Sequence, residues 1–251
     1  MITIRFEDPS TYPKGLYDDV TSSLFLFKPL FPNSEIDEIE LSSRIDFRLR
    51  YSDTRIEQLV VRILETLEQT WMIGYHNTRL LHKNDLDNIG LMLLTPESYF
   101  PWIRNVLTEL NICDSLQSEV VTKLKEYTGN KHGNRTDMLA FFAPYSLSQT
   151  YAKFTLNIGG EICEFALDGA FPDVYEKLTK HGYPVTVEFR FPFSEVVDWR
   201  KNTVVVEFLR YYIAKNLFGY DYKIELDGAT KTGIPAKDIL RILDFVDEWK
   251  E

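Results

Sequence analysis

The chain has 251 residues, of which 44% are hydrophobic and 14% aromatic; it can form one large domain or two modest ones, and it is not a disordered chain. Its formal net charge of −10 argues against a broad basic face for duplex nucleic acid or anionic membrane, but leaves open a small basic groove for a single strand. The two cysteines, Cys113 and Cys163, have no metal-binding spacing, so we expect a reduced, cytoplasmic protein without a metal site. The N-terminal residues lack a signal-peptide pattern, and no apolar run approaches the ~20 residues of a membrane helix.

The N-terminal part predicts short strands followed by a helix. Residues 2–6 alternate in a strand pattern, and residues 45–51 alternate apolar with charged side chains, which predicts a half-buried strand. From Thr54 the apolar residues follow the spacing of an amphipathic helix. We expect residues 1–69 to form an N-terminal segment packed on a second part, residues 70–251.

The stretch 72–81 begins as an apolar strand and is then interrupted by Tyr75-His76-Asn77-Thr78-Arg79. A buried polar group without a hydrogen-bond partner costs on the order of 1–3 kcal/mol. A core strand is therefore not expected to carry four polar residues in succession, as His76 to Arg79 do. This interruption is therefore the first candidate site.

The rest of the chain mixes predicted helices and strands, without internal repeats or long linkers. Together with the N-terminal part, this predicts the α+β fold class. Helices are predicted at 82–91, from Pro96, at 116–127, 144–151, 170–180, 204–217 (as a helix or a strand-helix hybrid) and 235–249, and strands at 138–143, 185–191 and 222–226.

Three motifs follow one another in the chain: Tyr75 to Arg79; Phe142-Ala143 with Ser148 and Tyr151; and Gly159-Gly160-Glu161. Their order and local sequence resemble the ADP-ribosyltransferases of the histidine-tyrosine-glutamate type, to which diphtheria toxin and the poly(ADP-ribose) polymerases belong. In that family the first strand carries a His-Gly-Thr-like motif, the second block reads Phe-Ala…Ser…Tyr, and the third supplies a glutamate. The resemblance covers about half of the chain and implies a split, mixed β-core that holds NAD in a cleft, with a helical C-terminal extension.

The resemblance also implies roles for individual residues. Cleavage of the nicotinamide–ribose bond develops positive charge on the ribose, and Glu161 is the candidate catalytic carboxylate that faces it. His76 would hydrogen-bond a ribose hydroxyl, and the ring of Tyr151 would stack on nicotinamide. The further candidate NAD-binding residues are Asn77, Thr78, Ser148 and Tyr145.

A second resemblance is to bacterial proteins of the same superfamily that carry a Tyr-His-x-Thr-Arg-Leu start, several of which are toxins or phage-defence effectors. It implies transfer of ADP-ribose to a nucleic acid or protein acceptor, and a neutralising antitoxin as a partner. Asn77 departs from the family, which usually has glycine there. Gly159 stands where the arginine- and asparagine-modifying toxins carry Glu or Gln, so the chain does not resemble that group.

Structural alternatives exist for each candidate residue. His76 could be a satisfied histidine at a strand end, Glu161 a surface acid after a Gly-Gly turn, and Tyr145 and Tyr151 packing residues. For the whole chain, the alternatives are a non-catalytic interaction module of the same fold, which Asn77 favours, and an unrelated fold in which His76 and Glu161 lie far apart.

Overall fold

The computed structural model describes residues 2–30, 37–50, 54–82, 84–129, 137–156, 158–219 and 222–245. The protein is α+β, as the sequence predicts. Its chain divides into two compact units, and each is made of two separate segments. Unit 1 is Met1–Ile73 with Phe191–Gly228, and unit 2 is Gly74–Arg190 with Ala229–Glu251.

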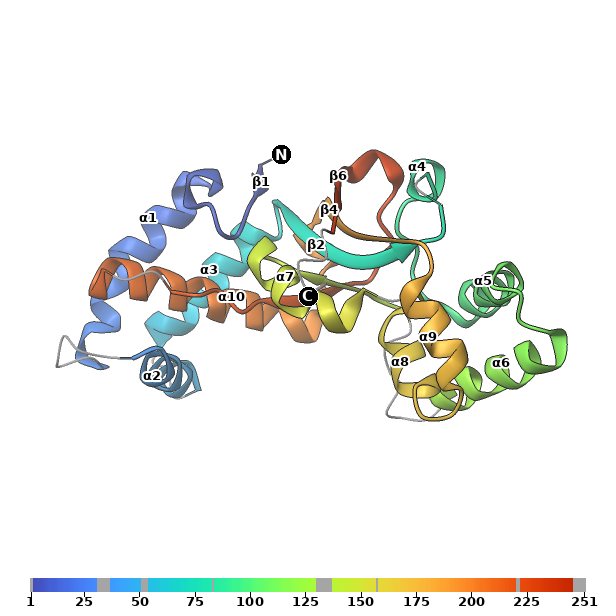
Figure 1. The fold of residues 1–251 in the computed structure, drawn as a ribbon. Coiled ribbons are helices and arrows are strands. Elements are labelled where there is room, and N and C mark those ends of the chain that lie inside the picture. Colours follow the sequence, from blue (N-terminus) through green and yellow to red (C-terminus); the bar gives the residue numbers. More distant parts are fainter. Residues whose placement is uncertain are drawn as a thin grey trace. The chain divides into compact units, whose positions relative to one another are not determined.

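Unit 1 is mainly helical (Figure 1). The helix predicted from Thr54 is confirmed, and its four buried apolar residues, at positions 56, 59, 63 and 67, form the stripe that an amphipathic helix turns to its neighbours. The predicted strand at 2–6 is confirmed in part, because β1 pairs in parallel with the start of β2 at Trp71 and Met72. The elements of unit 1 are β1 (Thr3–Ile4), α1 (Lys14–Ser23), α2 (Glu38–Arg50), α3 (Thr54–Leu67), α10 (Asp198–Ile213), a π-helical turn (Ala214–Phe218) and four short 3₁₀ turns (Pro9–Thr11, Leu24–Leu26, Lys28–Leu30, Phe193–Glu195).

The strand predicted at 45–51 is wrong, because α2 covers its described residues. Leu41 and Ile45, one helical turn apart, are fully buried, and Arg44 pairs with Glu40 across the same spacing. Phe47, which a strand would place on the same face as Ile45, is 61% exposed. The alternation of apolar and charged residues at 45–51 is therefore part of a helix with one buried face, and not a strand pattern.

Unit 2 is built around a sheet whose strands lie in the order β5-β3-β2-β4-β6. β2 and β3 are antiparallel, with Tyr75 opposite Phe142, and so are β4 and β6, with Glu188 opposite Arg241. β2, β4 and β5 each carry residues of both units. The strands are β2 (Trp71–Leu80), β3 (Leu139–Phe142), β4 (Tyr183–Pro192), β5 (Asp227–Thr230) and β6 (Ile239–Asp244).

Helices of unit 2 pack on this sheet and on one another (Figure 1). α7 packs against β3, whereas α5, α6, α8 and α9 enclose a separate hydrophobic cluster that includes Ile103, Val120 and Leu178. The predicted helices at 82–91, from Pro96, and at 116–127, 144–151 and 170–180 are confirmed with shifted ends. The helices of unit 2 are α4 (Leu86–Ile89), α5 (Pro96–Glu109), α6 (Asp114–Gly129), α7 (Tyr145–Thr155), α8 (Gly160–Leu167) and α9 (Pro172–Lys180), and a 3₁₀ turn, Ala236–Asp238, precedes β6.

Two predictions near the C-terminus are wrong. The helix predicted at 235–249 is, over its described residues, a 3₁₀ turn followed by β6, because pairing with β4 outweighs the helical spacing of the apolar residues. The C-terminal extension is therefore not helical as far as residue 245. Residues 222–226 form no strand, and β5 begins at Asp227.

Candidate functional site

The polar interruption lies within β2, and its side chains divide between the two faces of the sheet. Because successive side chains of a strand point to opposite faces, Tyr75, Asn77 and Arg79 share one face and His76 and Thr78 share the other. α7 covers the first face, since all three of those residues contact α7 or the residue that follows it. The candidate residues of β2 therefore do not point to a single face.

His76 is half-buried and held by the neighbouring strand. Its Nδ1 lies 2.8 Å from the carbonyl oxygen of Ala140. Because a carbonyl only accepts, Nδ1 carries the proton and Nε2 is left as an acceptor. Desolvation by the surrounding protein lowers the pKa of His76, and the bond to Ala140 opposes this shift. The ring is therefore neutral at pH 7 and can accept a hydrogen bond from a hydroxyl group.

Asn77 is buried and its side-chain amide is fully used by the protein. Nδ2 donates to the carbonyl of Ser148 at 2.7 Å and to Oγ1 of Thr155 at 2.9 Å, and Oδ1 accepts from Oγ1 of Thr186 at 2.8 Å. Gln149 donates to the same Thr186 hydroxyl at 3.2 Å. This network ties β2, α7 and β4 together.

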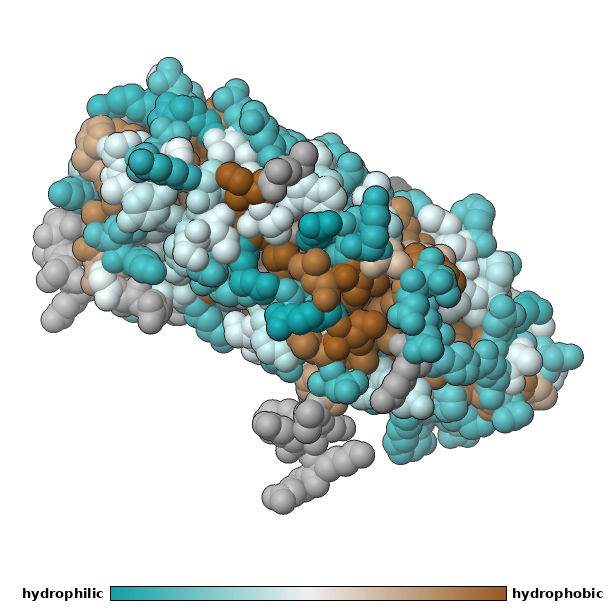
Figure 2. Space-filling view, turned by 90° about the horizontal axis from the view of Figure 1, so that it is seen from above, coloured by the Kyte–Doolittle hydropathy of each residue, from teal (hydrophilic) through white to brown (hydrophobic). Residues whose placement is uncertain are grey.

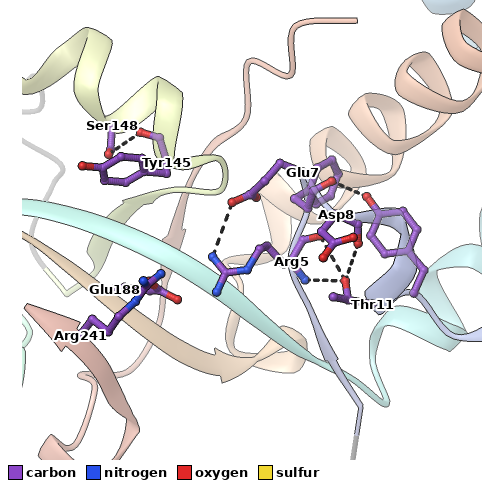
Figure 3. Close-up of polar contacts among 10 residues, drawn as sticks. Arg5, Glu7, Asp8, Thr11, Tyr145, Ser148, Glu188 and Arg241 are labelled. Carbon is purple, nitrogen blue, oxygen red and sulfur yellow. Dashed lines mark hydrogen bonds and ion pairs between the residues drawn. The ribbon is translucent and has the colours of Figure 1, made fainter. Parts of the chain in front are cut away.

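Ser148 lies at the centre of this network and is fully buried. Its hydroxyl donates to the carbonyl of Tyr145 at 2.7 Å, one turn earlier in α7 (Figure 3). The backbone and side chain of Ser148 both serve the fold in this conformation. The structure thus brings Asn77 and Ser148 together, but as parts of a structural network.

Tyr145 and Tyr151 are exposed aromatic residues of α7, at 39% and 44%. Tyr145 makes an edge-to-face contact with the buried Tyr75, at 5.4 Å between ring centroids. Tyr151 stacks on Phe142 of β3 with centroids 5.6 Å apart and planes inclined by 4°. The ring of Tyr151 is therefore held flat from one side while much of the side chain meets solvent, as a stacking platform requires.

Glu161 lies in the first turn of α8, a helix that contacts α6, α7 and α9. Gly159 starts this helix in the left-handed conformation, with φ of 86°, and a Cβ at that position would lie 2.4 Å from the Sγ of Cys163. Glycine at position 159 is therefore required by local packing. Glu161 is on a different element from His76 and from the tyrosines of α7, and it is half-buried.

Glu188 is a buried acid that the sequence reading overlooked. It lies on β4, 1% exposed, on the face that carries Thr186, and its Oε2 accepts from Nε of Arg241 at 2.7 Å (Figure 3). The signal in the sequence is a polar residue at every second position, Thr186, Glu188 and Arg190, within an otherwise apolar strand.

Within the described residues, no group of three His, Cys, Asp or Glu side chains could hold a metal ion, and none of the helices combines the length and apolar content that a membrane span needs. Comparisons with protein-family models, with curated proteins and with solved structures gave no match.

Proposed function

We propose that the chain transfers ADP-ribose from NAD to a macromolecular acceptor, a nucleic acid or a protein, with an ADP-ribosyltransferase-type core in unit 2. The observation that supports this proposal is the continuous unit of β2, β3 and α7. In it, a neutral His76 is hydrogen-bonded to β3, and α7, which follows β3 and covers the opposite face of β2, exposes Tyr145 and Tyr151. A bacterial defence toxin with a neutralising antitoxin partner is the biological setting that fits this activity.

The chemistry assigns one task to each group. The resemblance assigns Tyr151, supported by Phe142, to the nicotinamide ring and Nε2 of His76 to a ribose hydroxyl, although α7 and the His76 side chain lie on opposite faces of β2. Glu161 faces the positive charge that develops on the ribose as the glycosidic bond breaks. Thr78 shares the face of His76 and adds a second hydroxyl contact.

The test is transfer of label from NAD to cell lysate by the purified chain. We expect Glu161→Gln to abolish both transfer and NAD hydrolysis, and Glu164→Gln, on the same helix, to leave them unchanged. Glu188→Gln tests whether the buried acid of β4 is the catalytic carboxylate in place of Glu161. If the wild-type chain neither transfers label, nor hydrolyses NAD, nor binds NAD, the enzyme proposal is wrong.

A second candidate function is a non-catalytic interaction module. The observation that favours it is that Asn77 is hydrogen-bonded to the Ser148 carbonyl and to Thr186, and the Ser148 hydroxyl to the Tyr145 carbonyl, since these groups are then not offered to a ligand. Calorimetric titration with NAD distinguishes the two proposals. A heat of binding supports the transferase, and its absence supports the module.

A further inference from the structure

Two arginines stand on neighbouring strands of unit 2, and a buried carboxylate holds each of them. Arg241 of β6 donates through Nε and Nη2 to Glu188, whose side chain is 1% exposed. Arg190 of β4 donates through Nε to Asp238 at 3.0 Å, and that side chain is 5% exposed. The arginine side chains themselves are 59% and 44% exposed. In both pairs, the acid is inside and the cation reaches solvent.

The arginines lie on the same face of the sheet. Glu188 and Arg190 are two residues apart on β4, so their side chains share a face, and Arg241 shares it because it is opposite Glu188 in register. The register shifts between Glu188 and Phe189, but the extra residue, Leu240, is on β6, so the alternation along β4 is kept. Neighbouring strands are about 4.8 Å apart, so side chains as long as arginine on adjacent strands can reach a common ligand. Arg241 also borders a surface hollow along β6, together with Leu86 and Asp87 of α4.

Stability alone does not explain these pairs. Removing a carboxylate from water costs several kcal/mol, and well-packed apolar residues in place of a buried ion pair are often as stable or more stable. Apolar residues occupy the alternate positions of the same strand, Val185, Val187 and Phe189, and Leu240 and Ile242 of β6 are exposed apolar residues. Figure 2 shows that apolar side chains also gather on the face seen from above. What the buried acids do provide is a fixed orientation for each guanidinium group.

We infer that Arg241 and Arg190 form a binding site for a phosphate or pyrophosphate group. A guanidinium group presents its N–H donors in a planar fork that matches phosphate oxygens, and the contact of Arg241 with Glu188 uses one edge of that fork. Each arginine is balanced by its own acid, so the site attracts a compact dianion through directed donors and not through a broad positive field. The net charge of −10 likewise disfavours a long polyanion.

This inference does not depend on the proposed transfer reaction, because a chain that never cleaves NAD would still bind the anion. The phosphate group could belong to free pyrophosphate or to a nucleotide. Calorimetric titrations with pyrophosphate, ADP and adenosine separate these sources. We expect pyrophosphate and ADP to bind and adenosine not to bind; about tenfold tighter binding of ADP than of pyrophosphate identifies a nucleotide as the ligand.

The matched variant is the double substitution Arg241→Gln with Glu188→Gln. It leaves the net charge unchanged and keeps two amides that can hydrogen-bond across the strands, so it removes the directed donors of Arg241 without an orphaned buried charge. We expect pyrophosphate affinity to fall by about tenfold or more. Lys237→Gln, which removes an exposed cation from the turn before β6, should change the affinity less than about twofold.

A measurement on the unmodified chain does not require any variant to fold. Phenylglyoxal modifies exposed arginines, and peptide mass spectrometry locates the sites. We expect pyrophosphate to protect Arg241 and Arg190, and to leave Arg104, exposed on α5, unprotected. Absence of pyrophosphate binding at millimolar concentration, equal binding by the double variant, or equal modification with and without pyrophosphate would overturn the inference.

Discussion

The side-chain amide of Asn77 donates a hydrogen bond to the main-chain carbonyl of Ser148 at 2.7 Å, although 71 residues separate them in the chain. The same amide accepts from Thr186 at 2.8 Å, 109 residues away. One side chain thus fixes the spacing between β2, α7 and β4. The exposed tyrosines of α7 depend on this spacing, because they lie on the helix that Asn77 holds.

We expect Asn77→Ala to lower the free energy of unfolding by about 2–3 kcal/mol. Truncation removes three hydrogen bonds and leaves the Ser148 carbonyl and the Thr186 hydroxyl buried without this partner. Urea denaturation followed by circular dichroism measures the change. The matched control is Asn105→Ala on the exposed face of α5, which should stay within about 0.5 kcal/mol of wild type. Equal effects of the two substitutions would contradict the role given to Asn77.

Burial of His76 should make stability depend on pH. The pKa of the folded state lies below the usual 6.5, so between the two values the unfolded chain binds more protons than the folded chain. This contribution to stability is complete above pH 6.5 and is lost as the pH falls through the folded-state pKa. We expect His76→Gln to flatten the decline in urea midpoint below pH 6.5, and His181→Gln, at an exposed position, to preserve it. An NMR titration in which His76 protonates at or above 6.5 would refute this assignment.

The spacing of apolar residues along the sequence predicted those helices and strands whose formation depends on local packing. α3 follows its apolar stripe closely, and β2 is where the apolar run placed it. The pattern failed at residues 45–51 and 235–249, where alternate and helical spacings coincide over a few residues. In α2 the helix prevails because Leu41 and Ile45 are buried on one face, whereas β6 becomes a strand through its register with β4. The elements that decide these cases, α10 packed on α2 and β4 paired with β6, are not adjacent to them in the sequence.

The candidate site was predictable only in part, for the same reason. The polar run at 75–79 marked β2 as unusual, but nothing in it shows that the Asn77 side chain binds Thr186 or that α7 covers the face of Asn77. Glu188 was overlooked because a single acid in a strand carries little signal without Arg241, which lies 53 residues further along the chain. The sequence locates polar residues in strands, and the sheet decides which of them meet.

Helix α2 offers a direct test of the corrected element. In a strand, Ile45 and Phe47 would share a face, whereas in the helix Ile45 is fully buried and Phe47 is 61% exposed. We expect Ile45→Ala to cost about 2–4 kcal/mol of unfolding free energy, and Phe47→Ala to cost less than about 1.5 kcal/mol. Comparable losses of unfolding free energy for both variants in urea denaturation would instead support the strand predicted at 45–51.

The two glycines before Glu161 should differ in their tolerance of a side chain. Both have positive φ, 86° for Gly159 and 61° for Gly160, so alanine is strained at either position by about 1–2 kcal/mol. Only at Gly159 does a Cβ also meet buried atoms, the Sγ of Cys163 at 2.4 Å and the hydroxyl of Tyr99 at 3.0 Å. We therefore expect Gly159→Ala to destabilise the chain by about 1–3 kcal/mol more than Gly160→Ala does.

The reactivity of the two cysteine thiols measures the effect of Gly159→Ala without a full unfolding curve. Burial raises the pKa of Cys163 to about 12, partly opposed by its hydrogen bond with Tyr99, whereas hydrogen bonds from Ser115 and Leu116 lower the pKa of the exposed Cys113. Because the thiolate is the reactive form, an aromatic disulfide reagent should modify Cys113 quickly and Cys163 slowly in the wild-type chain. Gly159→Ala should accelerate the slow phase, because the displaced Cys163 loses its packing, and Gly160→Ala should leave it nearly unchanged. If both variants accelerated the slow phase equally, backbone strain alone would account for the effect. The close contact between Gly159 and Cys163 would then not stabilise the start of α8.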